Sequence, residues 1–295
     1  MSKIPVSEKI KKCAAATEAA FDKFVPATNT RPAIVHEAMN YSLRAGGKRL
    51  RPALLLAAFE AFPSSNDPLP AAVAIECLHT YSLIHDDLPC MDNSDLRRGQ
   101  ATCHKKFGET IALLAGDALL THALTLLADA YAATPALATN LVSELGNAAS
   151  SRKLIGGQVE DTIGERGEAT AERLDFIHEN KTAALITAAI VMGFRLGNAP
   201  QSAIDAARAA GREIGIAFQI IDDILDETSD AATMGKPVGA DAENGKLTYT
   251  RFHGMEKSRA RAKELSQSAI SRLKKIGGNT DFLVALVAEM SARIS

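Results

Sequence analysis

Apolar residues recur at spacings of three and four along most of the chain, which is the period of an amphipathic α-helix. Val and Thr do not cluster in alternating runs, so no segment predicts a strand. No linker of distinct composition divides the chain, and we expect one all-α domain over residues 1–295 with about ten helices. The predicted helices cover residues 7–24, 33–45, 51–62, 71–88, 109–133, 136–155, 171–196, 201–228, 256–275 and 280–293.

The composition strengthens the helical prediction and narrows the function. The chain has no Trp, only 5% of its residues are aromatic, and Ala, Leu and Ile dominate, which favours helix over sheet. A net charge of −2 gives no general footprint for nucleic acid or for an anionic membrane. An anionic ligand would therefore have to bind at a local cluster of basic residues.

Other features of the chain indicate a cytoplasmic protein with no membrane partner. The N-terminal residues lack the apolar core of a signal peptide, and the four cysteines lack the paired spacings of disulfide or zinc frameworks. The most apolar stretch, residues 110–133, contains Asp117 and His122. We therefore expect it to be a helix buried inside the protein rather than a membrane span.

Two stretches place adjacent aspartates at the end of an apolar segment, LIHDDLPCMDNSDLRRG from Leu83 and GIAFQIIDDILDET from Gly215. In the second stretch, Asp222 and Asp226 lie about 40° apart around a helix, so their side chains share a face. In the first stretch, the spacing of Asp86, Asp87 and Asp92 does not fit one face of a helix. Pro89 should end that helix and allow the chain to fold back.

Carboxylates this close raise one another's pKa unless a cation compensates. Mg²⁺ takes oxygen ligands, and two such clusters in one chain, one with arginines beside it, favour a site over a solvated surface. The two clusters could lie on opposite sides of a central cavity. The predicted metal ligands are Asp86, Asp87, Asp92, Asp222, Asp223 and Asp226.

Basic residues near these clusters predict binding of phosphate groups. Arg97 and Arg98 follow the first cluster, and AGGKRLRP places Lys48, Arg49 and Arg51 at the start of a helix, where backbone amides also attract anions. His79 lies two helical turns before Asp86, as a phosphate donor or as a structural residue.

The polar, Gly-rich segment 229–255 carries further basic residues, Lys236 and Lys246. A loop of this length is either a lid over an anionic ligand or a surface loop. Six aspartates balance the charge of three Mg²⁺ ions. The negative charge of a bound diphosphate would then have to be neutralised by Lys181, Lys236 and Arg97. A second phosphate ligand would need its own basic site.

In this order, GGKRLRP, LIHDDLPCMDNSDLRRG, GGQVED, KT and FQIIDDILD resemble the motifs of trans-isoprenyl diphosphate synthases. The resemblance covers residues 25–290 and is greatest to the bacterial short-chain farnesyl diphosphate synthase (geranyltranstransferase) group, whose longer DDxxxxD form the first motif has. It implies the isoprenoid synthase fold, with helices around a deep central cavity, and a cytoplasmic homodimer.

The resemblance also implies a role for each motif. The two aspartate motifs would hold three Mg²⁺ ions on an allylic diphosphate, and the sequence leaves open whether Mn²⁺ serves as well. The allylic diphosphate would be contacted by Arg97, Lys181 and Lys236, with Gln219 nearby. Thr182 and Lys246 are further predicted substrate-binding residues. Isopentenyl diphosphate would be bound by Lys48, Arg51, His79 and Arg98.

The implied reaction condenses isopentenyl diphosphate with dimethylallyl or geranyl diphosphate, by ionisation, condensation and elimination. Tyr81, with the small Ser82 beside it, looks like the stop that limits the product to the C15 farnesyl chain; Tyr81 as plain core is the alternative. A geranyl or geranylgeranyl diphosphate synthase is the nearest rival. A terpene cyclase and a non-catalytic prenyl-binding subunit are more distant ones.

Overall fold

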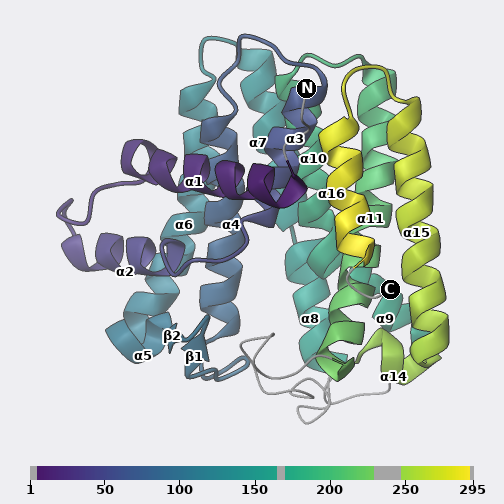
Figure 1. Ribbon diagram of the computed structural model, residues 1–295. Coiled ribbons are helices and arrows are strands. Elements are labelled where there is room, and N and C mark those ends of the chain that lie inside the picture. The colour runs from purple at the N-terminus through teal and green to yellow at the C-terminus, as the bar shows by residue number, and fades with distance from the viewer. Residues whose placement is uncertain (1–4, 165–169, 229–246, 293–295) are drawn as a thin grey trace. The chain divides into compact units, whose positions relative to one another are not determined.

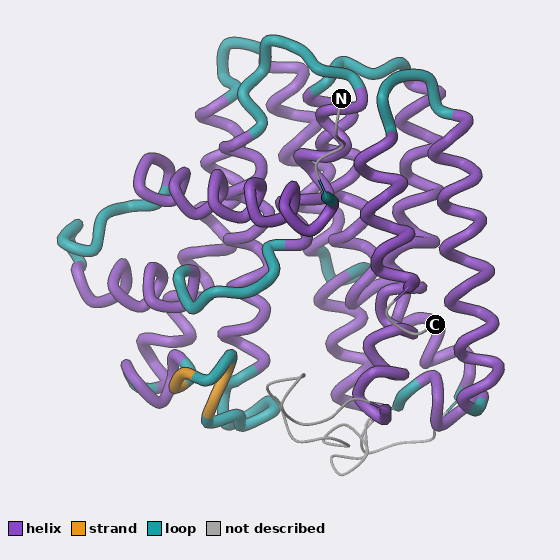
Figure 2. The backbone as a smooth tube through the Cα atoms, viewed as in Figure 1, coloured by secondary structure: helices purple, strands orange, loops and turns teal. Residues whose placement is uncertain are grey.

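The computed structural model describes residues 5–164, 170–228 and 247–292 of the chain (Figures 1 and 2). The described elements in chain order are α1 (Val6–Phe24), α2 (Ala33–Leu43), α3 (Leu50–Ala61), α4 (Leu69–Asp86), β1 (Leu96–Arg97), β2 (Gln100–Ala101), α5 (Cys103–Phe107), α6 (Glu109–Ala130), α7 (Pro135–Ala149), α8 (Leu154–Gly164), α9 (Ala171–Ile177), the π-helix η1 (His178–Ala183), α10 (Ala184–Leu196), α11 (Gln201–Thr228), α14 (Tyr249–His253), α15 (Met255–Lys275) and α16 (Asp281–Ala292). The predicted all-α class is confirmed.

The chain forms two compact units. Unit 1 comprises Met1–Leu56 and Ser65–Ser143, and unit 2 comprises Ala57–Ser64 and Glu144–Ser295. The first aspartate motif belongs to unit 1 and the second to unit 2. The prediction of one domain over the whole chain stays a prediction.

Unit 1 is organised around α4, which packs along α6 and also contacts α1 and α2 (Figure 1). Residues Pro70–Leu78 of α4 are all buried, as expected for a core helix that is apolar around its whole circumference. Glu76 is the exception, and its buried carboxylate accepts a hydrogen bond from Arg49 at 2.8 Å. The long apolar stretch forms α6, the one described helix whose length and composition would allow a membrane crossing, and it packs against α2, α4 and α5.

Unit 2 is organised around α11, which packs against α15, α10, η1 and α14. Ile220, Ile221 and Ile224 of α11 form a buried cluster with Leu265 of α15. Helix α8 approaches η1 so closely that a Cβ atom on Gly157 would lie 2.3 Å from the backbone nitrogen of Lys181. Only glycine therefore fits at position 157.

The structure departs from the predicted elements in several places. The helix expected over 136–155 is two helices, α7 and α8, separated by a turn at which the Ser150 amide and hydroxyl both donate to the Asn147 carbonyl. The helix expected over 171–196 contains the π-helical segment η1. The expectation that no strand forms was wrong, since β1 and β2 pair as a short hairpin, orange in Figure 2. Within 229–255, residues 249–253 form α14, and 229–246 lie outside the described residues.

Candidate functional site

The first aspartate motif lies where α4 ends. Asp86 is the last helical residue, and Asp87 is the C-cap. The backbone amide of Asp92 then donates to the Asp86 carbonyl at 2.9 Å, so the chain after Pro89 folds back as predicted. The amide of Ser94 also donates to the Asp87 carbonyl at 3.2 Å. The aspartates of the motif are thus held on one hydrogen-bonded turn.

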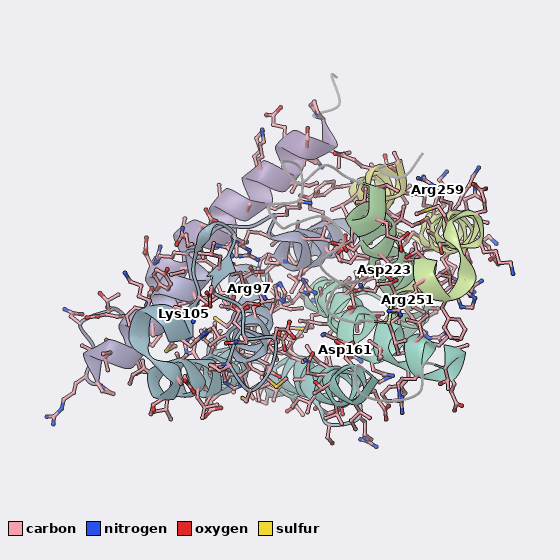
Figure 3. All side chains as sticks on the ribbon, turned by 90° about the horizontal axis from the view of Figure 1, so that it is seen from below. Arg97, Lys105, Asp161, Asp223, Arg251 and Arg259 are labelled. Atoms are coloured by element: carbon pink, nitrogen blue, oxygen red, sulfur yellow. The ribbon has the colours of Figure 1, made fainter. Side chains whose placement is uncertain are left out.

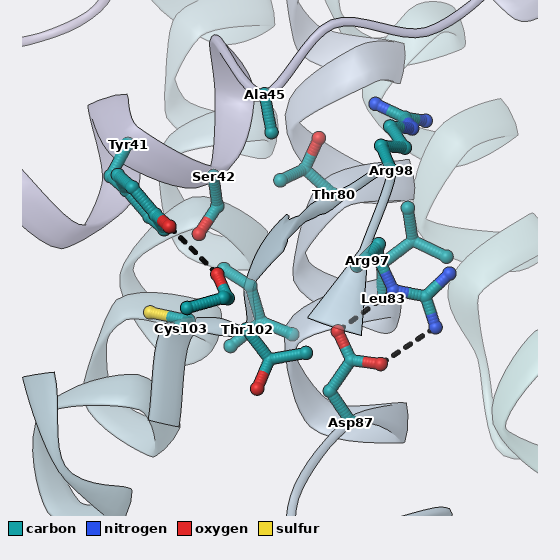
Figure 4. A pocket seen from close by; sticks show the side chains of 12 residues that line it. Tyr41, Ser42, Ala45, Thr80, Leu83, Asp87, Arg97, Arg98, Thr102 and Cys103 are labelled. Atoms are coloured by element: carbon teal, nitrogen blue, oxygen red, sulfur yellow. Dashed lines mark hydrogen bonds and ion pairs between the residues drawn. The ribbon is translucent and has the colours of Figure 1, made fainter. Parts of the chain in front are cut away.

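Arg97 forms a bidentate ion pair with Asp87 (Figure 4). Its Nε donates to Oδ2 and its Nη2 donates to Oδ1, both at 2.7 Å. Burial works against the charged guanidinium, but the hydrogen bonds and charge of Asp87, with Asp86 and Asp92, raise its pKa above the ordinary value. Arg97 is therefore charged and already holds the buried Asp87 carboxylate, because strand β1 places it there.

Arg98 points to a different partner because it lies in the turn of the hairpin, with φ of 54°. Its guanidinium donates to the Gly46 carbonyl. A Cβ atom on Gly47 would lie 2.5 Å from the Arg98 Cζ, so the glycine at position 47 leaves room for the Arg98 guanidinium against the loop before α3.

A cluster of cations surrounds His79. Arg51 Nη1 lies 3.1 Å from His79 Nε2. Burial, followed by the charges of Arg51, Arg98, Arg97 and Arg49, holds the pKa of His79 well below its ordinary value. His79 is therefore neutral, with Nε2 accepting from Arg51 and the proton on Nδ1. Arg97 is paired with Asp87 and Arg49 with Glu76, so the attraction of this part of unit 1 for an anion depends mainly on Arg51 and Arg98.

A small pocket opens beside these groups in unit 1 (Figure 4). Asp87, Arg97 and Arg98 line its charged side, and Leu83, Ile84 and Ala101 are among its apolar residues. Hydrogen bonds fix its remaining wall, since the Tyr41 hydroxyl donates to the Ala101 carbonyl at 2.7 Å. Phosphate-binding chemistry and apolar surface thus occur together in this pocket.

Tyr81, the predicted chain-length residue, is buried on α4. Its ring meets the His85 ring edge-on, with centroids 5.6 Å apart. Burial, with the charge of Asp86, raises the pKa of Tyr81 to about 12. Its hydroxyl has no hydrogen-bond partner in the described part of the chain, which is unusual for a buried phenol. Ser82 donates its hydroxyl to the His79 carbonyl at 2.8 Å.

The second aspartate motif lies near the end of α11 in unit 2 (Figure 3). Asp223 is buried, accepts from Gln219 Nε2 at 2.9 Å and accepts from the backbone amide of Tyr249 at 2.7 Å. His178 Nε2 lies 3.5 Å from Asp223 Oδ2. Asp226 is also buried, and Asp222 is partly exposed.

The π-helix η1 supplies two predicted substrate-binding residues. Lys181 donates to Asp161 of α8 at 2.5 Å (Figure 3). Thr182 donates to Gln219 Oε1 at 2.8 Å, and Gln219 in turn holds Asp223. The structure therefore joins Thr182, Gln219 and Asp223 in one chain of hydrogen bonds. π-helical turns occur often at functional sites.

The donor set fits magnesium in chemistry, since it consists of carboxylate oxygens, which Mg²⁺ prefers. Within the described ranges, no three Asp, Glu, His or Cys side chains converge closely enough to hold a metal. The second aspartate of each motif has both oxygens engaged, Asp87 by Arg97 and Asp223 by Gln219 and the Tyr249 amide. Binding of a metal ion by Asp87 would therefore displace Arg97, or the carboxylate would have to bind Arg97 and the metal at the same time.

The remaining predicted residues fall into two groups. Lys48 is exposed in the loop that precedes α3. Lys236 and Lys246 lie outside the described residues. Sequence reasoning missed the part played by Arg49 and Glu76, although a lone acid inside an apolar helix signals a buried partner. It also missed Tyr249, whose backbone amide gives no signal in a sequence.

Comparisons with known proteins agree with the motifs. The model of the polyprenyl synthetase family matches residues 32–284. A protein of Arabidopsis thaliana described as the large subunit 1 of heterodimeric geranylgeranyl pyrophosphate synthase is 45% identical over 91% of this chain and 73% of its own. The farnesyl diphosphate synthase of Bacillus subtilis is 46% identical over 76% of this chain and 77% of its own.

Solved structures agree as well. An FPP/GFPP synthase from Zymomonas mobilis matches with a TM-score of 0.85 and 32% identity, over 97% of this chain and 98% of that one. A geranyltransferase from Helicobacter pylori, complexed with magnesium and isoprenyl diphosphate, matches with a TM-score of 0.84 and 31% identity, over 98% and 97%.

The fold is that of the isoprenoid synthases, as the motifs predicted. The chain belongs to the polyprenyl synthetase family. It is a prenyltransferase of isoprenoid biosynthesis, whose substrates are prenyl diphosphates.

Proposed function

We propose that this protein condenses isopentenyl diphosphate with dimethylallyl and then geranyl diphosphate, and that its product is the C15 farnesyl diphosphate. The observation that supports this best is the cation cluster of unit 1, in which Arg51, Arg97 and Arg98 act on a neutral His79 beside an aspartate motif. A prenyltransferase of this kind needs binding sites for two diphosphates, and this cluster places Arg51 and Arg98 near the first aspartate motif in addition to Arg97, which pairs with Asp87.

The proposed roles follow from charge. Lys48, Arg51, Arg98 and His79 bind the diphosphate of isopentenyl diphosphate and hold its double bond near the allylic carbon. Arg97, Lys181 and Lys236, with Thr182, Gln219 and Lys246 nearby, bind the allylic diphosphate and stabilise the negative charge that develops as its C–O bond breaks. No described side chain of the motifs serves as an obvious base, so the released diphosphate takes the final proton.

Magnesium is part of the proposal. Asp86, Asp87, Asp92, Asp222, Asp223 and Asp226 would hold three Mg²⁺ ions, which supply Lewis-acid stabilisation of the departing diphosphate. The solved Helicobacter pylori relative is described as a complex with magnesium. Replacing Mg²⁺ by Mn²⁺ in the assay tests whether the softer ion also supports turnover.

The C15 product rests on Tyr81, whose buried ring lies on α4, five residues before Asp86. A geranylgeranyl product is the second candidate, because the plant relative that covers 91% of this chain is described as a subunit of a geranylgeranyl pyrophosphate synthase. A geranyl product would mean that growth of the prenyl product stops one condensation earlier.

One assay separates these functions. The purified protein is incubated with Mg²⁺, dimethylallyl diphosphate and radiolabelled isopentenyl diphosphate, and the products are separated by chain length. Farnesyl diphosphate supports the proposal, while C10 or C20 as the main product refutes the chain length. A hydrocarbon product from farnesyl diphosphate alone would identify a cyclase. Binding of prenyl diphosphates without turnover would identify a non-catalytic subunit.

We also propose a homodimer in the cytoplasm. Helix α6 exposes Leu113 and Leu114, which are 46% and 48% accessible, and exposed apolar side chains on one helix are typical of an interface. The Arabidopsis relative is described as a subunit of a heterodimer, so the partner has to be tested. Light scattering should give twice the mass of the chain, and Leu113→Glu with Leu114→Glu should give the monomer mass.

A further inference from the structure

Arg49 lies in the sequence between two proposed ligands of isopentenyl diphosphate, Lys48 and Arg51, but its side chain points into the protein. The guanidinium-bearing side chain is 0% exposed. It donates to Glu18 of α1 at 3.1 Å, to Glu76 of α4 at 2.8 Å and to the Leu43 carbonyl at the end of α2 at 2.5 Å. Arg49 therefore contacts three helices of unit 1 and has no surface left for a substrate.

The partners of Arg49 explain why arginine is needed. The Glu76 side chain is 2% exposed and stands alone among the apolar residues of α4, where an unpaired carboxylate would be costly. Arg49 neutralises it and uses its remaining donors on Glu18 and Leu43. The planar fork of a guanidinium reaches several acceptors at once, which the single ammonium group of lysine does not.

The same contacts fix the path of the backbone. Arg49 has φ of 47°, a conformation that costs energy for a residue other than glycine. Its carbonyl accepts from the Ala53 amide at 3.0 Å and so begins α3. The anchored side chain thus sets the point and direction from which Lys48 and Arg51 leave the loop.

The anchor is adjacent to the binding cluster on α4 as well. Glu76 and His79 are three residues apart on that helix, which places them on neighbouring turns of one side. Arg49 contacts Glu76 and Arg51 contacts His79 at 3.1 Å. Two parallel contacts therefore join the loop and the start of α3 to α4, one buried and one at the proposed site.

We propose that Arg49 is a positioning residue for the isopentenyl diphosphate site, and this proposal rests on the proposed function above. Arg49 does not touch the substrate. It holds the Gly46–Arg51 segment against α4, so that the cations of Lys48 and Arg51 occupy fixed positions before the diphosphate arrives.

The test compares two variants with the wild type. Arg49→Lys keeps the positive charge but loses the planar guanidinium that donates to several acceptors at once. The double variant Arg49→Met with Glu76→Met removes the ion pair without leaving an unpaired buried charge, so it should fold. In both variants we expect the KM for isopentenyl diphosphate to rise about tenfold or more, while the KM for the allylic substrate and kcat stay within about threefold.

A matched control separates positioning from loss of stability. Arg208 forms a bidentate pair with Glu144 at 2.6 and 2.7 Å in unit 2 and has no proposed role in binding. Arg208→Lys should leave both KM values at those of the wild type, even if the protein unfolds at a lower temperature.

Two outcomes would overturn the proposal. Both Arg49 variants could fold with a KM for isopentenyl diphosphate within about twofold of the wild type, or both KM values could rise equally. If the wild type itself forms no prenyl product, the proposed function fails separately. Titration calorimetry with inorganic diphosphate in the absence of metal then still tests the role of Arg49. Replacement of Arg49 should raise the Kd of inorganic diphosphate about tenfold.

Discussion

At the scale of single residues, the aspartates of one motif have different surroundings. Asp87 is buried and paired with Arg97 through both oxygens, while Asp92 is exposed on the turn that follows. The two aspartates should therefore respond differently to removal of their charge.

We expect Asp92→Asn to lower kcat/KM by about 100-fold or more and to change the unfolding free energy by less than about 0.5 kcal/mol. Asp87→Asn should also reduce activity, but it should destabilise the protein by about 1–3 kcal/mol, because Arg97 loses its partner. Steady-state kinetics and urea unfolding measure the two effects. Equal stability of both variants would contradict this difference.

His79 should make stability depend on pH. Burial and the surrounding arginines lower its pKa in the folded protein, so the unfolded chain binds more protons, and the unfolding free energy falls as the pH drops below about 6.5. We expect His79→Gln to flatten this fall, measured by urea unfolding between about pH 7 and pH 5. Burial also lowers the pKa of His122, so part of the slope should remain.

Tyr81 should decide the product. Tyr81→Ala removes a buried ring and should shift the product beyond C15, because the growing chain gains the vacated space. Tyr81→Phe should keep the wild-type product, since the Tyr81 hydroxyl has no partner among the described residues. Chromatography of the products tests both, and unchanged chain length in Tyr81→Ala would exclude Tyr81 as the stop.

Residue types and spacings were enough to identify both aspartate motifs and the basic residues near them. The fold-back of Asp92 could be predicted because Pro89 forces the end of a helix. The anchoring of Arg49 could not, because a sequence does not show which of three neighbouring cations turns inward. That choice depends on Glu76, which lies 27 residues away in sequence and meets Arg49 only in the folded unit.

At the scale of elements, helices with strong boundaries were predictable. Helix α11 runs over Gln201–Thr228, as its apolar period indicated, and α4 ends before Pro89. The break between α7 and α8 was not predictable, because the apolar period indicated one continuous helix over 136–155. The hairpin β1–β2 escaped prediction because each strand has two residues.

The packing of α8 on η1 gives an element-scale prediction. Gly157→Ala places a Cβ atom 2.3 Å from the backbone nitrogen of Lys181, so α8 has to move away from η1 and Lys181 is displaced. We expect a loss of about 2–4 kcal/mol in stability and at least about tenfold in kcat. Gly277→Ala is the control, because a Cβ there meets nothing within 4 Å. Wild-type activity in Gly157→Ala would contradict the close approach.

At the scale of the whole molecule, the family and the all-α fold followed from the order of the motifs, and the comparisons confirmed both. Chain length of the product did not follow, since relatives of nearly equal identity are described as geranylgeranyl and farnesyl synthases. Motifs record the shared ionisation chemistry. Product length depends on the volume and shape of a cavity, which single positions alter without touching any motif.

Ligand binding should stabilise the whole molecule more when metal and diphosphate are present together than when either is present alone. At 100 times its Kd, a ligand of the folded state adds about 2.7 kcal/mol, which should raise Tm by about 3–6 °C for a chain of this size. Thermal unfolding with Mg²⁺, with diphosphate and with both tests this expectation. Chelation of the metal should abolish turnover and leave Tm of the ligand-free protein unchanged.

The π-helix η1 has a consequence for catalysis. A π turn contains one residue more than the α turn it replaces, so deleting a single residue from His178–Ala183 would give an uninterrupted helix from α9 to α10. That helix would be more regular, but residues before the deletion would rotate by about 100° relative to those after it. We expect a variant with this deletion to be a poorer catalyst, because the deletion would turn the side chains of α9 away from those of α10.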